Sequence, residues 1–588
     1  MTYIKAVLAI TLLIVFTFSR LSAQPKFINQ LELKDSSKVD ANEWFYAGIN
    51  LNVAFGSTDV RYLRHQVPEE IYSNELKITA WKGERVNMQI VIWSVRNSYN
   101  INIQPSDLIT NDKIISADVV KIFPVRYVMT DKFVQGTGNK KSDSIQCSLA
   151  PDLLDNPGTF SISGRSTRPV WVTIDVPDNA KPGFYKGYIE IKAKGRFKKR
   201  LHYSLEVQDR IFPKPSEWKF HLDLWQHPWS VSRYSSLKEW STEHWDALRS
   251  VLTMLAGAGQ KCITTTLVHD PWGGRSFDPY ESMVDWLKSS DGGWTFDFTL
   301  FDQWVTFAMS CGIKEQIDCY SMIPRDYSFR YFDETDNEYK VLNATPGSSA
   351  FENHWRPFLL AFREHLQNKG WMDKTCIALD ECDLKDMLSV IKFIKTTTPE
   401  FKIAFAGKYN PEIADDIYDL SLLNDSHADS LSIGKRCDNH LPTTFYVSDS
   451  KQAHPNDFTF SPLAENTSMG WHAMALGYSG YVRWAYNSWG KDPERDSRFK
   501  TLPAGDSYLV YPGARSSIRF ELLHAGIQDY EKIRILKESF KKEGTEEANQ
   551  KLIRLQEMLK PFTLPVQTAN SASILVNRGK EILNELSR

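Results

Sequence analysis

Along the first third of the chain, hydrophobic and polar residues alternate with a period of two. Such alternation is typical of strands that bury one face and expose the other. It recurs in four stretches, 76–81, 86–93, 170–176 and 187–193. Turn-rich segments containing Pro, Gly and Asn, such as Pro177–Gly183, separate strands of this kind. We therefore predict an antiparallel β-sandwich over residues 24–212.

A different rhythm begins after the break at Phe212-Pro-Lys-Pro215. Short apolar runs of strand length now alternate with stretches in which apolar residues recur every three or four positions, as in a helix that buries one side. The strand-like runs cover 220–225, 262–268, 317–320, 376–379, 402–406, 443–447 and 480–485, and the helix-like stretches cover 245–258, 300–311, 355–366 and 384–394. This alternation predicts a (β/α)8 TIM-like barrel over residues 213–535, followed by a C-terminal helical segment, residues 536–588, that packs on it.

The first 23 residues have the pattern of a cleavable export signal. A basic start, Met1–Lys5, precedes the apolar run Ala6–Phe18, and the small residue Ala23 closes the segment. We expect cleavage after Ala23 and export to the periplasm or the cell exterior. No later segment has the length of a membrane span, so the mature chain is expected to contain no integral membrane segment. The sequence leaves the oligomeric state open.

Composition narrows the possible functions mainly by exclusion. The formal net charge of -2 provides no basic face of the kind that nucleic acid requires. Aromatic residues make up 13% of the chain, which suits a cleft that stacks on sugar rings, although many of these rings will fill the core. The seven Cys residues form no CxxC pair and no zinc-ligand spacing. There is also no P-loop, dinucleotide-binding glycine pattern, HExxH or GxSxG, so we expect no disulfide framework, no metal and no cofactor.

Two adjacent carboxyls, Asp380 and Glu381, follow the buried run Cys376–Leu379. In a barrel of this type, the C-terminal ends of the strands carry the active site. Neighbouring side chains point to opposite faces of a regular strand, so this pair cannot flank a scissile bond symmetrically as two separate carboxyls do. Where the chain turns, both can reach one pocket with different roles. Glu381 would act as general acid/base on the leaving oxygen, while Asp380 would orient a 2-acetamido group that itself attacks the anomeric carbon.

Seven stretches of the chain together resemble a known family in the same order: Trp81–Gln89, Val176–Tyr188, Ala378–Glu381, Arg483–Trp489, Tyr511–Gly513, Arg519–Glu521 and Gly526–Tyr530. They resemble glycoside hydrolase family 123, the bacterial β-N-acetylgalactosaminidases, and its exported glycoside-hydrolase-like relatives. The resemblance implies a β-sandwich followed by a barrel, and retaining hydrolysis through an oxazoline. It also implies that Asp380 stabilises the intermediate and that Glu381 is the acid/base. The implied partner is a carbohydrate, a glycan or glycolipid that ends in β-linked N-acetylgalactosamine.

Position in the barrel selects further candidates, because loops after the strand ends build the pocket. For sugar contacts we expect Trp225, His269, Tyr320, Tyr446, Trp484, Tyr486, Asn487 and Trp489. Either Tyr446 or Tyr486 would donate a hydrogen bond to the acetamido oxygen. A packing role is the alternative for each of these side chains. Arg519 and Glu521 are expected to form an ion pair beneath the pocket.

Two other functions are compatible with these residues. The first is a glycosidase for another sugar, with a second carboxylate on a different strand. The second is a carbohydrate-binding protein whose barrel has lost catalysis, although the intact Asp380–Glu381 pair argues against it. Aryl glycosides of 2-acetamido and 2-hydroxy sugars, compared side by side, would distinguish these functions.

Overall fold

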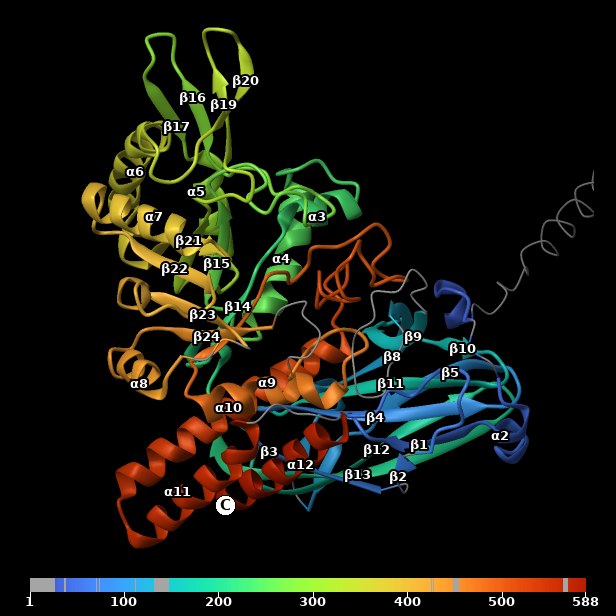
Figure 1. Cartoon of the computed structure of the whole chain (residues 1–588). Coiled ribbons are helices and arrows are strands. Elements are labelled where there is room, and N and C mark those ends of the chain that lie inside the picture. The colour runs from blue at the N-terminus through green and yellow to red at the C-terminus, as the bar shows by residue number, and fades with distance from the viewer. Residues whose placement is uncertain are drawn as a thin grey trace, which may run out of the picture.

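The computed structural model describes residues 27–131, 147–447, 454–563 and 569–588, apart from residues 36, 38, 70, 73, 74, 112, 425 and 427. The expected signal peptide, residues 1–23, lies outside this described part of the chain. Figure 1 shows two bodies side by side: a sheet-rich one from the N-terminal third, and one in which strands and helices alternate. The last helices lie at the junction between the two bodies.

The N-terminal body consists of two packed sheets. Its strands are β1 (Asn52–Gly56), β2 (Ile71–Tyr72), β3 (Glu75–Lys82), β4 (Arg85–Ser94), β5 (Ser98–Pro105), β6 (Leu108–Thr110), β7 (Lys113–Ile115), β8 (Val120–Asp131), β9 (Cys147–Leu154), β10 (Phe160–Ile162), β11 (Ser166–Asp175), β12 (Gly183–Ala193) and β13 (Phe197–Ile211). One sheet has the order β2-β1-β4-β11-β8-β9, and the other β10-β5-β12-β13-β3, with β6 beside β12 and β7 beside β6. The predicted sandwich is confirmed, except that β3 and β13 pair in parallel.

The alternation in the sequence explains how the two sheets pack. Ile90 and Val172 from one sheet, and Ile189 and Leu205 from the other, are fully buried in a single core. Side chains at the alternate, outward-facing positions, such as Lys186 on β12, are exposed to solvent. Because the side-chain period is two, the register of each strand fixes which residues enter this core.

The second body is a barrel of eight parallel strands, as the sequence predicts. In chain order these are β14 (His221–Leu224), β15 (Cys262–Thr266), β18 (Gln316–Tyr320), β21 (Thr375–Asp380), β22 (Lys402–Gly407), β23 (Asp419–Leu423), β24 (Thr443–Tyr446) and β25 (Gly480–Arg483). Hydrogen-bonded neighbours run β14-β25-β24-β23-β22-β21-β18-β15. The first and last strands of this path, β14 and β15, meet at an isolated bridge between Leu222 and Gln260. The barrel is therefore nearly closed, with a seam between β14 and β15.

Helices follow most of the barrel strands and pack on their outer side. They are α3 (Pro228–Tyr234), α4 (Thr242–Ala256), α5 (Thr299–Ser310), α6 (Ser349–Lys369), α7 (Leu384–Thr397), α8 (Ser430–Asp438) and α9 (Leu463–Leu476), while α2 (Ala41–Tyr46) belongs to the sandwich.

The sequence shows why α6 begins and ends where it does. The Ser348 side chain accepts a hydrogen bond from the Phe351 N–H at the start, and Gly370 adopts a left-handed φ of 68° at the end.

Two parts of the barrel were not predicted. Strand β23 begins with Asp419 and contains Ser421, whose hydroxyl pairs with Thr444 inside the barrel, so it has no continuous apolar run. The second part is a separate four-stranded sheet, in the order β17-β16-β19-β20, inserted after β15 and β18. Its strands are β16 (Asp285–Lys288), β17 (Trp294–Asp297), β19 (Ser328–Asp333) and β20 (Glu338–Asn343).

The junction between sandwich and barrel is formed largely by α9 and α10 (Ile518–Glu543), with α11 (Glu546–Leu559) and α12 (Ala569–Leu586) beside them. Helix α10 runs through residue 535, so the predicted boundary between barrel and helical segment falls inside a helix. Arg519 on α10 pairs with Asp152 of β9 at 3.0 Å, whereas Glu521 faces Arg85 of β4 at 3.6 Å. The expected Arg519–Glu521 pair is wrong because residues two apart on a helix do not face each other.

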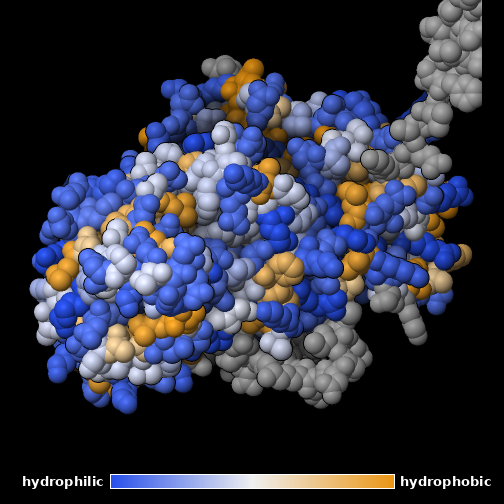
Figure 2. Space-filling view, turned by 90° about the horizontal axis from the view of Figure 1, so that it is seen from above, coloured by the Kyte–Doolittle hydropathy of each residue, from blue (hydrophilic) through white to orange (hydrophobic). Residues whose placement is uncertain are grey.

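No helix in the described part of the chain combines the length and apolarity needed to cross a bilayer. Figure 2, which views the molecule from above, shows hydrophobic residues in small groups separated by hydrophilic ones.

Candidate active site

The chain changes direction where β21 ends, and this turn brings two carboxyls to one place. Asp380 is the last residue of β21, and Glu381 adopts a left-handed φ of 46° directly after it. The Glu381 N–H still donates to the Ala406 carbonyl of β22, at 2.8 Å. A positive φ costs a non-glycine residue of order 1 kcal/mol or more, and such strain is often found at functional sites. The turn removes the strand alternation that would send the two side chains to opposite faces.

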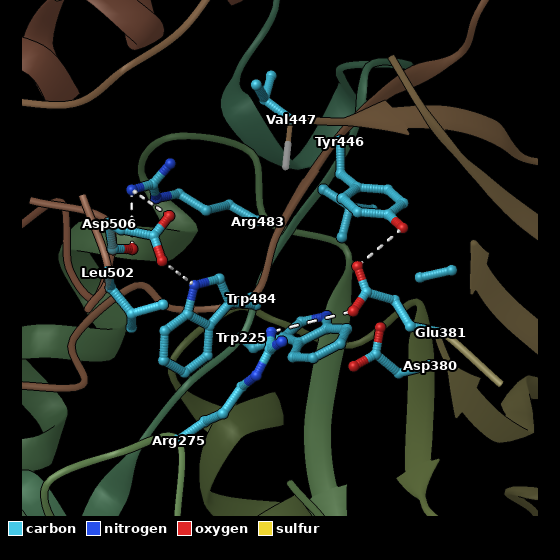
Figure 3. A pocket seen from close by; sticks show the side chains of 12 residues that line it. Trp225, Arg275, Asp380, Glu381, Tyr446, Val447, Arg483, Trp484, Leu502 and Asp506 are labelled. Atoms are coloured by element: carbon cyan, nitrogen blue, oxygen red, sulfur yellow. Dashed lines mark hydrogen bonds and ion pairs between the residues drawn. The ribbon is translucent and has the colours of Figure 1, made fainter. Parts of the chain in front are cut away.

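Both carboxyls line a cavity of about 590 Å³, open to solvent, at the C-terminal ends of the barrel strands. The cavity lies between Asp380–Glu381 on one side and the end of β25 on the other (Figure 3). Its lining residues are Trp225, Arg275, Asp380, Glu381, Ala406, Tyr446, Val447, Val482, Arg483, Trp484, Leu502 and Asp506.

Asp380 is the more enclosed of the two carboxyls. Burial, together with the negative charge of Glu381, raises the pKa of Asp380 to about 7. The positive charges of Arg325 and Arg275 and a hydrogen bond with Trp272 act in the opposite direction, since they favour the ionised carboxylate. Asp380 is therefore a carboxyl that changes its charge near neutral pH.

Glu381 reaches farther into the open part of the cavity, and its side chain is about one-third exposed. The Tyr446 hydroxyl donates to one of its oxygens at 3.3 Å, and the Arg325 guanidinium donates to the other at 3.2 Å. Arg275 lies 3.9 Å from that second oxygen. Figure 3 shows the Arg275 and Tyr446 side chains pointing at Glu381 from different directions. Glu381 thus has hydrogen-bond donors on both oxygens and remains accessible to a ligand.

Trp484 gives the cavity a flat apolar wall, whereas Trp225 borders the cavity with only 2% of its surface exposed. The Trp484 indole N–H donates to Asp506 at 2.7 Å, which fixes the ring beside the opening (Figure 3). The Trp225 ring packs at a tilt against Tyr320, with ring centroids 4.5 Å apart, and its indole N–H donates to Asp223 at 2.9 Å. The Trp484 ring, held by its own hydrogen bond, presents a rigid face on which the C–H side of a sugar can stack.

The structure brings five of the ten predicted site residues together at the cavity: Asp380, Glu381, Trp225, Tyr446 and Trp484. Tyr320 lies beneath Trp225, 4% exposed, and forms part of the layer that supports the cavity. The His269 imidazole pairs with Glu281 at 2.8 Å, outside the residues that line the cavity.

Tyr486, Asn487 and Trp489 do not line the cavity, in contrast to the prediction. All three are at most 2% exposed. The Tyr486 hydroxyl donates to the Val251 carbonyl, and the Trp489 indole donates to the Val510 carbonyl. The Asn487 side chain bonds the backbone of His227. These residues follow the end of β25, but the chain there turns into the core, so that they brace the loops around the cavity.

Sequence reasoning missed three polar residues at this site, Arg275, Arg325 and Asp506. Arg275 follows Gly273-Gly274 in the loop after β15, and Arg325 follows Pro324 in the loop after β18. The same positional rule that selected the aromatic candidates could have found both arginines. Asp506 lies in the long irregular segment between β25 and α10, where no periodicity indicates which residues turn inward.

This arrangement offers two carboxyls in unlike environments. One is enclosed and changes charge near neutral pH, and the other is accessible and hydrogen-bonded to a tyrosine and an arginine. Pairs of titratable groups in different environments are suited to separate acid/base and electrostatic roles. A flat aromatic wall, formed by Trp484, and an open cavity accompany them, so the site is suited to chemistry at a glycosidic bond.

Comparisons with known proteins agree with this geometry. Residues 225–536 match the family model for the glycoside hydrolase 123 catalytic domain, and residues 55–193 match the one for the glycoside hydrolase 123 N-terminal domain. A solved family 123 glycoside hydrolase from Clostridium perfringens is similar over 91% of this chain and 97% of its own. Its sequence identity is 27% and its TM-score is 0.81.

That Clostridium perfringens structure was described in connection with the hydrolysis of glycolipid glycans. A family 39 glycoside hydrolase from Bacteroides cellulosilyticus covers 78% of this chain and 82% of its own, with 11% identity and a TM-score of 0.34. This second likeness is too low to bear on the fold. No curated protein matches the sequence.

Proposed function

Because the chain belongs to glycoside hydrolase family 123, we propose that it is an exported, retaining exo-glycosidase that removes terminal β-linked N-acetylgalactosamine from glycans or glycolipids. Its glycoside hydrolase character follows from the family. The observation that carries the finer proposal is the placement of adjacent Asp380 and Glu381 carboxyls in one cavity. Export rests on the pattern of residues 1–23.

The proposed reaction uses the sugar's own acetamido group as nucleophile. The acetamido oxygen attacks the anomeric carbon, the glycosidic bond breaks, and Glu381 gives its proton to the departing oxygen. The product of this step is an oxazolinium ion, which Asp380 stabilises by accepting the acetamido N–H. Glu381, now a carboxylate, takes a proton from water as the water opens the ring. Two inversions at the anomeric carbon give net retention.

The environments of the two carboxyls support this division of roles. Glu381 is accessible, as a group that meets both the leaving oxygen and water must be. Asp380 is enclosed, so its charge, once the carboxyl is ionised above pH about 7, acts on the developing cation with little screening by solvent. The Tyr446 hydroxyl, 3.3 Å from Glu381, is near enough to contact the acetamido oxygen once a sugar is bound. Trp484 would supply a stacking face.

A comparison of aryl glycosides tests the proposal. We expect the mature protein to release aryl alcohol from a para-nitrophenyl β-N-acetylgalactosaminide and to leave the corresponding 2-hydroxy galactoside intact. A thiazoline analogue of the oxazoline should inhibit, because it resembles the intermediate. Equal turnover of the 2-hydroxy galactoside would contradict the proposal and favour a mechanism with a second, separate carboxylate. Binding of the acetamido sugar without hydrolysis would favour a binding protein.

A further inference from the structure

A second cluster of reactive side chains lies at the opposite end of the barrel from the cavity. His221, Cys262 and Asp419 are the first residues of β14, β15 and β23. Asp380 and Tyr446, in contrast, are the last residues of their strands. The three residues therefore meet at the N-terminal floor of the barrel, where the proposed hydrolysis does not take place.

The donor atoms of this floor cluster (His221, Cys262 and Asp419) lie within 4.8 Å of one another. The His221 Nε2 atom is 2.9 Å from Asp419 Oδ2 and 3.3 Å from Cys262 Sγ. In a tetrahedral zinc site with Zn–N near 2.0 Å and Zn–S near 2.3 Å, donor atoms are separated by roughly 3.3–3.7 Å. An ion would need to widen the observed separations by only a few tenths of an ångström.

The two groups at the barrel floor contain more acidic than basic side chains. Asp223 and Asp318 form a second group around the same Cys262 thiol. All three aspartates are 6% exposed or less, and His221 is the one basic side chain within either group. Asp419 Oδ1 is buried and has no hydrogen-bond partner among the described residues. A buried carboxylate oxygen without a donor is costly, and a bound cation would satisfy it.

The carboxylates are also oriented as metal-binding ones usually are. The Gln316 amide donates to Asp318 at 2.9 Å and to Asp419 at 2.7 Å, which holds both carboxylates in place. Asp223 accepts from the Trp225 indole, so its oxygens are already used. Outer hydrogen bonds of this kind fix the direction of metal ligands and are a regular feature of metal sites. Asp318 also hydrogen-bonds the Cys262 thiol, so it lies next to one of the three residues of the floor cluster.

We propose that His221, Cys262 and Asp419 bind a zinc ion, with Asp318 facing the fourth position. A thiolate and an imidazole are the ligands that zinc prefers, and carboxylates complete many of its sites. The thiol proton leaves when the ion binds, so that a thiolate, a neutral imidazole and carboxylates surround the metal. The His221 side chain is 12% exposed, which gives an ion a route in from the barrel floor.

The position of this site suggests a structural role. His221 belongs to β14 and Cys262 to β15, the two strands between which the barrel has its seam. Those strands meet at an isolated bridge, while the other neighbours share ladders of hydrogen bonds. A zinc ion held by β14, β15 and β23 would tie the first two strands together where the backbone pairing is weakest. The Asp223–Trp225 bond links this floor to the wall of the cavity.

Local motif spacing could not reveal this site. His221 and Cys262 are 41 residues apart along the chain, and the separation between Cys262 and Asp419 is larger. The sequence therefore predicts no metal, because zinc-ligand patterns are recognised by spacings of a few residues. Only the closing of the barrel places these three strand starts next to one another.

Zinc titration of the whole mature protein tests the proposal. After treatment with a chelator, we expect the protein to bind one equivalent of Zn²⁺ and its Tm to rise by about 5 °C. Co²⁺ in place of zinc should give the near-ultraviolet absorption of a thiolate–cobalt bond. If neither ion binds and Tm is unchanged, the cluster is a network of shared protons, and the proposal is wrong.

Matched cysteine variants identify the ligand. Cys262→Ser should abolish the thiolate–cobalt absorption and weaken zinc binding at least about 100-fold. Cys319→Ser is the control, because Cys319 is equally buried but follows Asp318 on β18 and points to the other face. If Cys262→Ser does not fold, Asp419→Asn should lower zinc affinity while keeping the absorption. Absorption that persists in Cys262→Ser, or disappears in Cys319→Ser, would overturn the proposal.

Discussion

At the scale of single residues, the site depends on the backbone of Glu381. Its φ of 46° interrupts the strand geometry directly after Asp380. Without this turn, one of two adjacent carboxyls would face away from the cavity. The proximity of the two charges then raises the pKa of the enclosed member, Asp380. A local backbone conformation thus determines both the geometry and the electrostatics of the proposed chemistry.

Glu381→Gln removes the proposed proton donor while keeping its shape. We expect kcat/KM for a para-nitrophenyl N-acetylgalactosaminide to fall by about 10²–10⁴, the usual contribution of general acid catalysis. The loss should be much smaller with a 2,4-dinitrophenyl leaving group, which departs without protonation. Steady-state kinetics with the two aryl glycosides measure the difference. An equal loss with both would assign Glu381 a role other than proton transfer.

Asp380→Asn tests the raised pKa through stability. The folded protein holds the Asp380 proton up to pH about 7, whereas the unfolded chain releases it near the ordinary value of 3.8. Between these values the unfolded state binds fewer protons, so the free energy of unfolding decreases as pH rises through this window. The asparagine variant lacks this penalty. We expect its Tm at pH 8 to exceed that of the unmodified protein by about 2–4 °C, with no gain at pH 4.

Thermal unfolding at both pH values provides the measurement for Asp380→Asn. Asp438→Asn, at an exposed position on α8, is the control and should change Tm little at either pH. A stability gain that is the same at pH 4 and pH 8 would show that ionisation is not its cause. The variant should have lost hydrolytic activity, because an amide cannot stabilise the oxazolinium ion as a carboxylate does.

At the scale of elements, α9 and α10 approach closely because both have glycine at the crossing. A Cβ atom at Gly470 would lie 1.9 Å from the Gly526 carbonyl oxygen, and one at Gly526 would lie 2.2 Å from the Thr467 carbonyl oxygen. These neighbours are backbone atoms, so a side chain could be accommodated only by separating the helices. Helix α10 also carries Arg519, so its position is coupled to the sandwich.

Gly526→Ala should therefore destabilise the protein although alanine is the better helix former. We expect a loss of about 1–3 kcal/mol, the range for overpacking in a well-packed core. Gly434→Ala in α8 is the matched control, since no atom lies within 4 Å of its added Cβ. That variant should be neutral or stabilised by up to about 1 kcal/mol. Denaturant unfolding of both variants measures the difference, and equal stability would contradict the close crossing.

At the scale of the whole molecule, a buried ion pair joins the two bodies. Asp152 of β9 accepts hydrogen bonds from the Arg519 guanidinium on α10, at 3.0 and 3.1 Å, and from the Tyr511 hydroxyl at 2.7 Å. Both charged side chains are fully buried. Arg519 also donates to three backbone carbonyls of the segment around the cavity, at Asp457, Gly505 and Tyr508. The sandwich therefore braces the loops that support the barrel mouth.

Asp152→Asn leaves the shape of this contact but removes the charge that balances Arg519. An uncompensated buried charge costs about 3–5 kcal/mol, so we expect a large drop in the midpoint of thermal unfolding. Glu400→Gln is the control, because Glu400 pairs with Arg363 at 3.5 Å on the surface. That change should cost less than about 1 kcal/mol. A small effect of Asp152→Asn would show that the junction does not depend on this pair.

Much of the fold was predictable from the sequence because it rests on local periodicity. The alternation over 170–176 and the helical spacing over 355–366 correspond to β11 and α6. Strand β23 was missed because Asp419 and Ser421 face the barrel interior, where each forms a hydrogen bond with another buried side chain. Periodicity records burial in an apolar core, so a strand with a polar buried face gives no such pattern.

The sequence by itself determined the order of sandwich and barrel and selected Asp380 and Glu381 as the candidate catalytic pair, because strand ends and adjacent carboxyls are local features. Only the tertiary structure decided which aromatic residues reach the cavity: it placed Trp484 there and buried Tyr486, two positions later, in the core. It also decided the partners of Arg275, Arg519 and Cys262, which come from distant segments. Their contacts depend on how the barrel closes and how the sandwich packs against it. A long-range arrangement of this kind cannot be recognised from the spacing of residues along the chain.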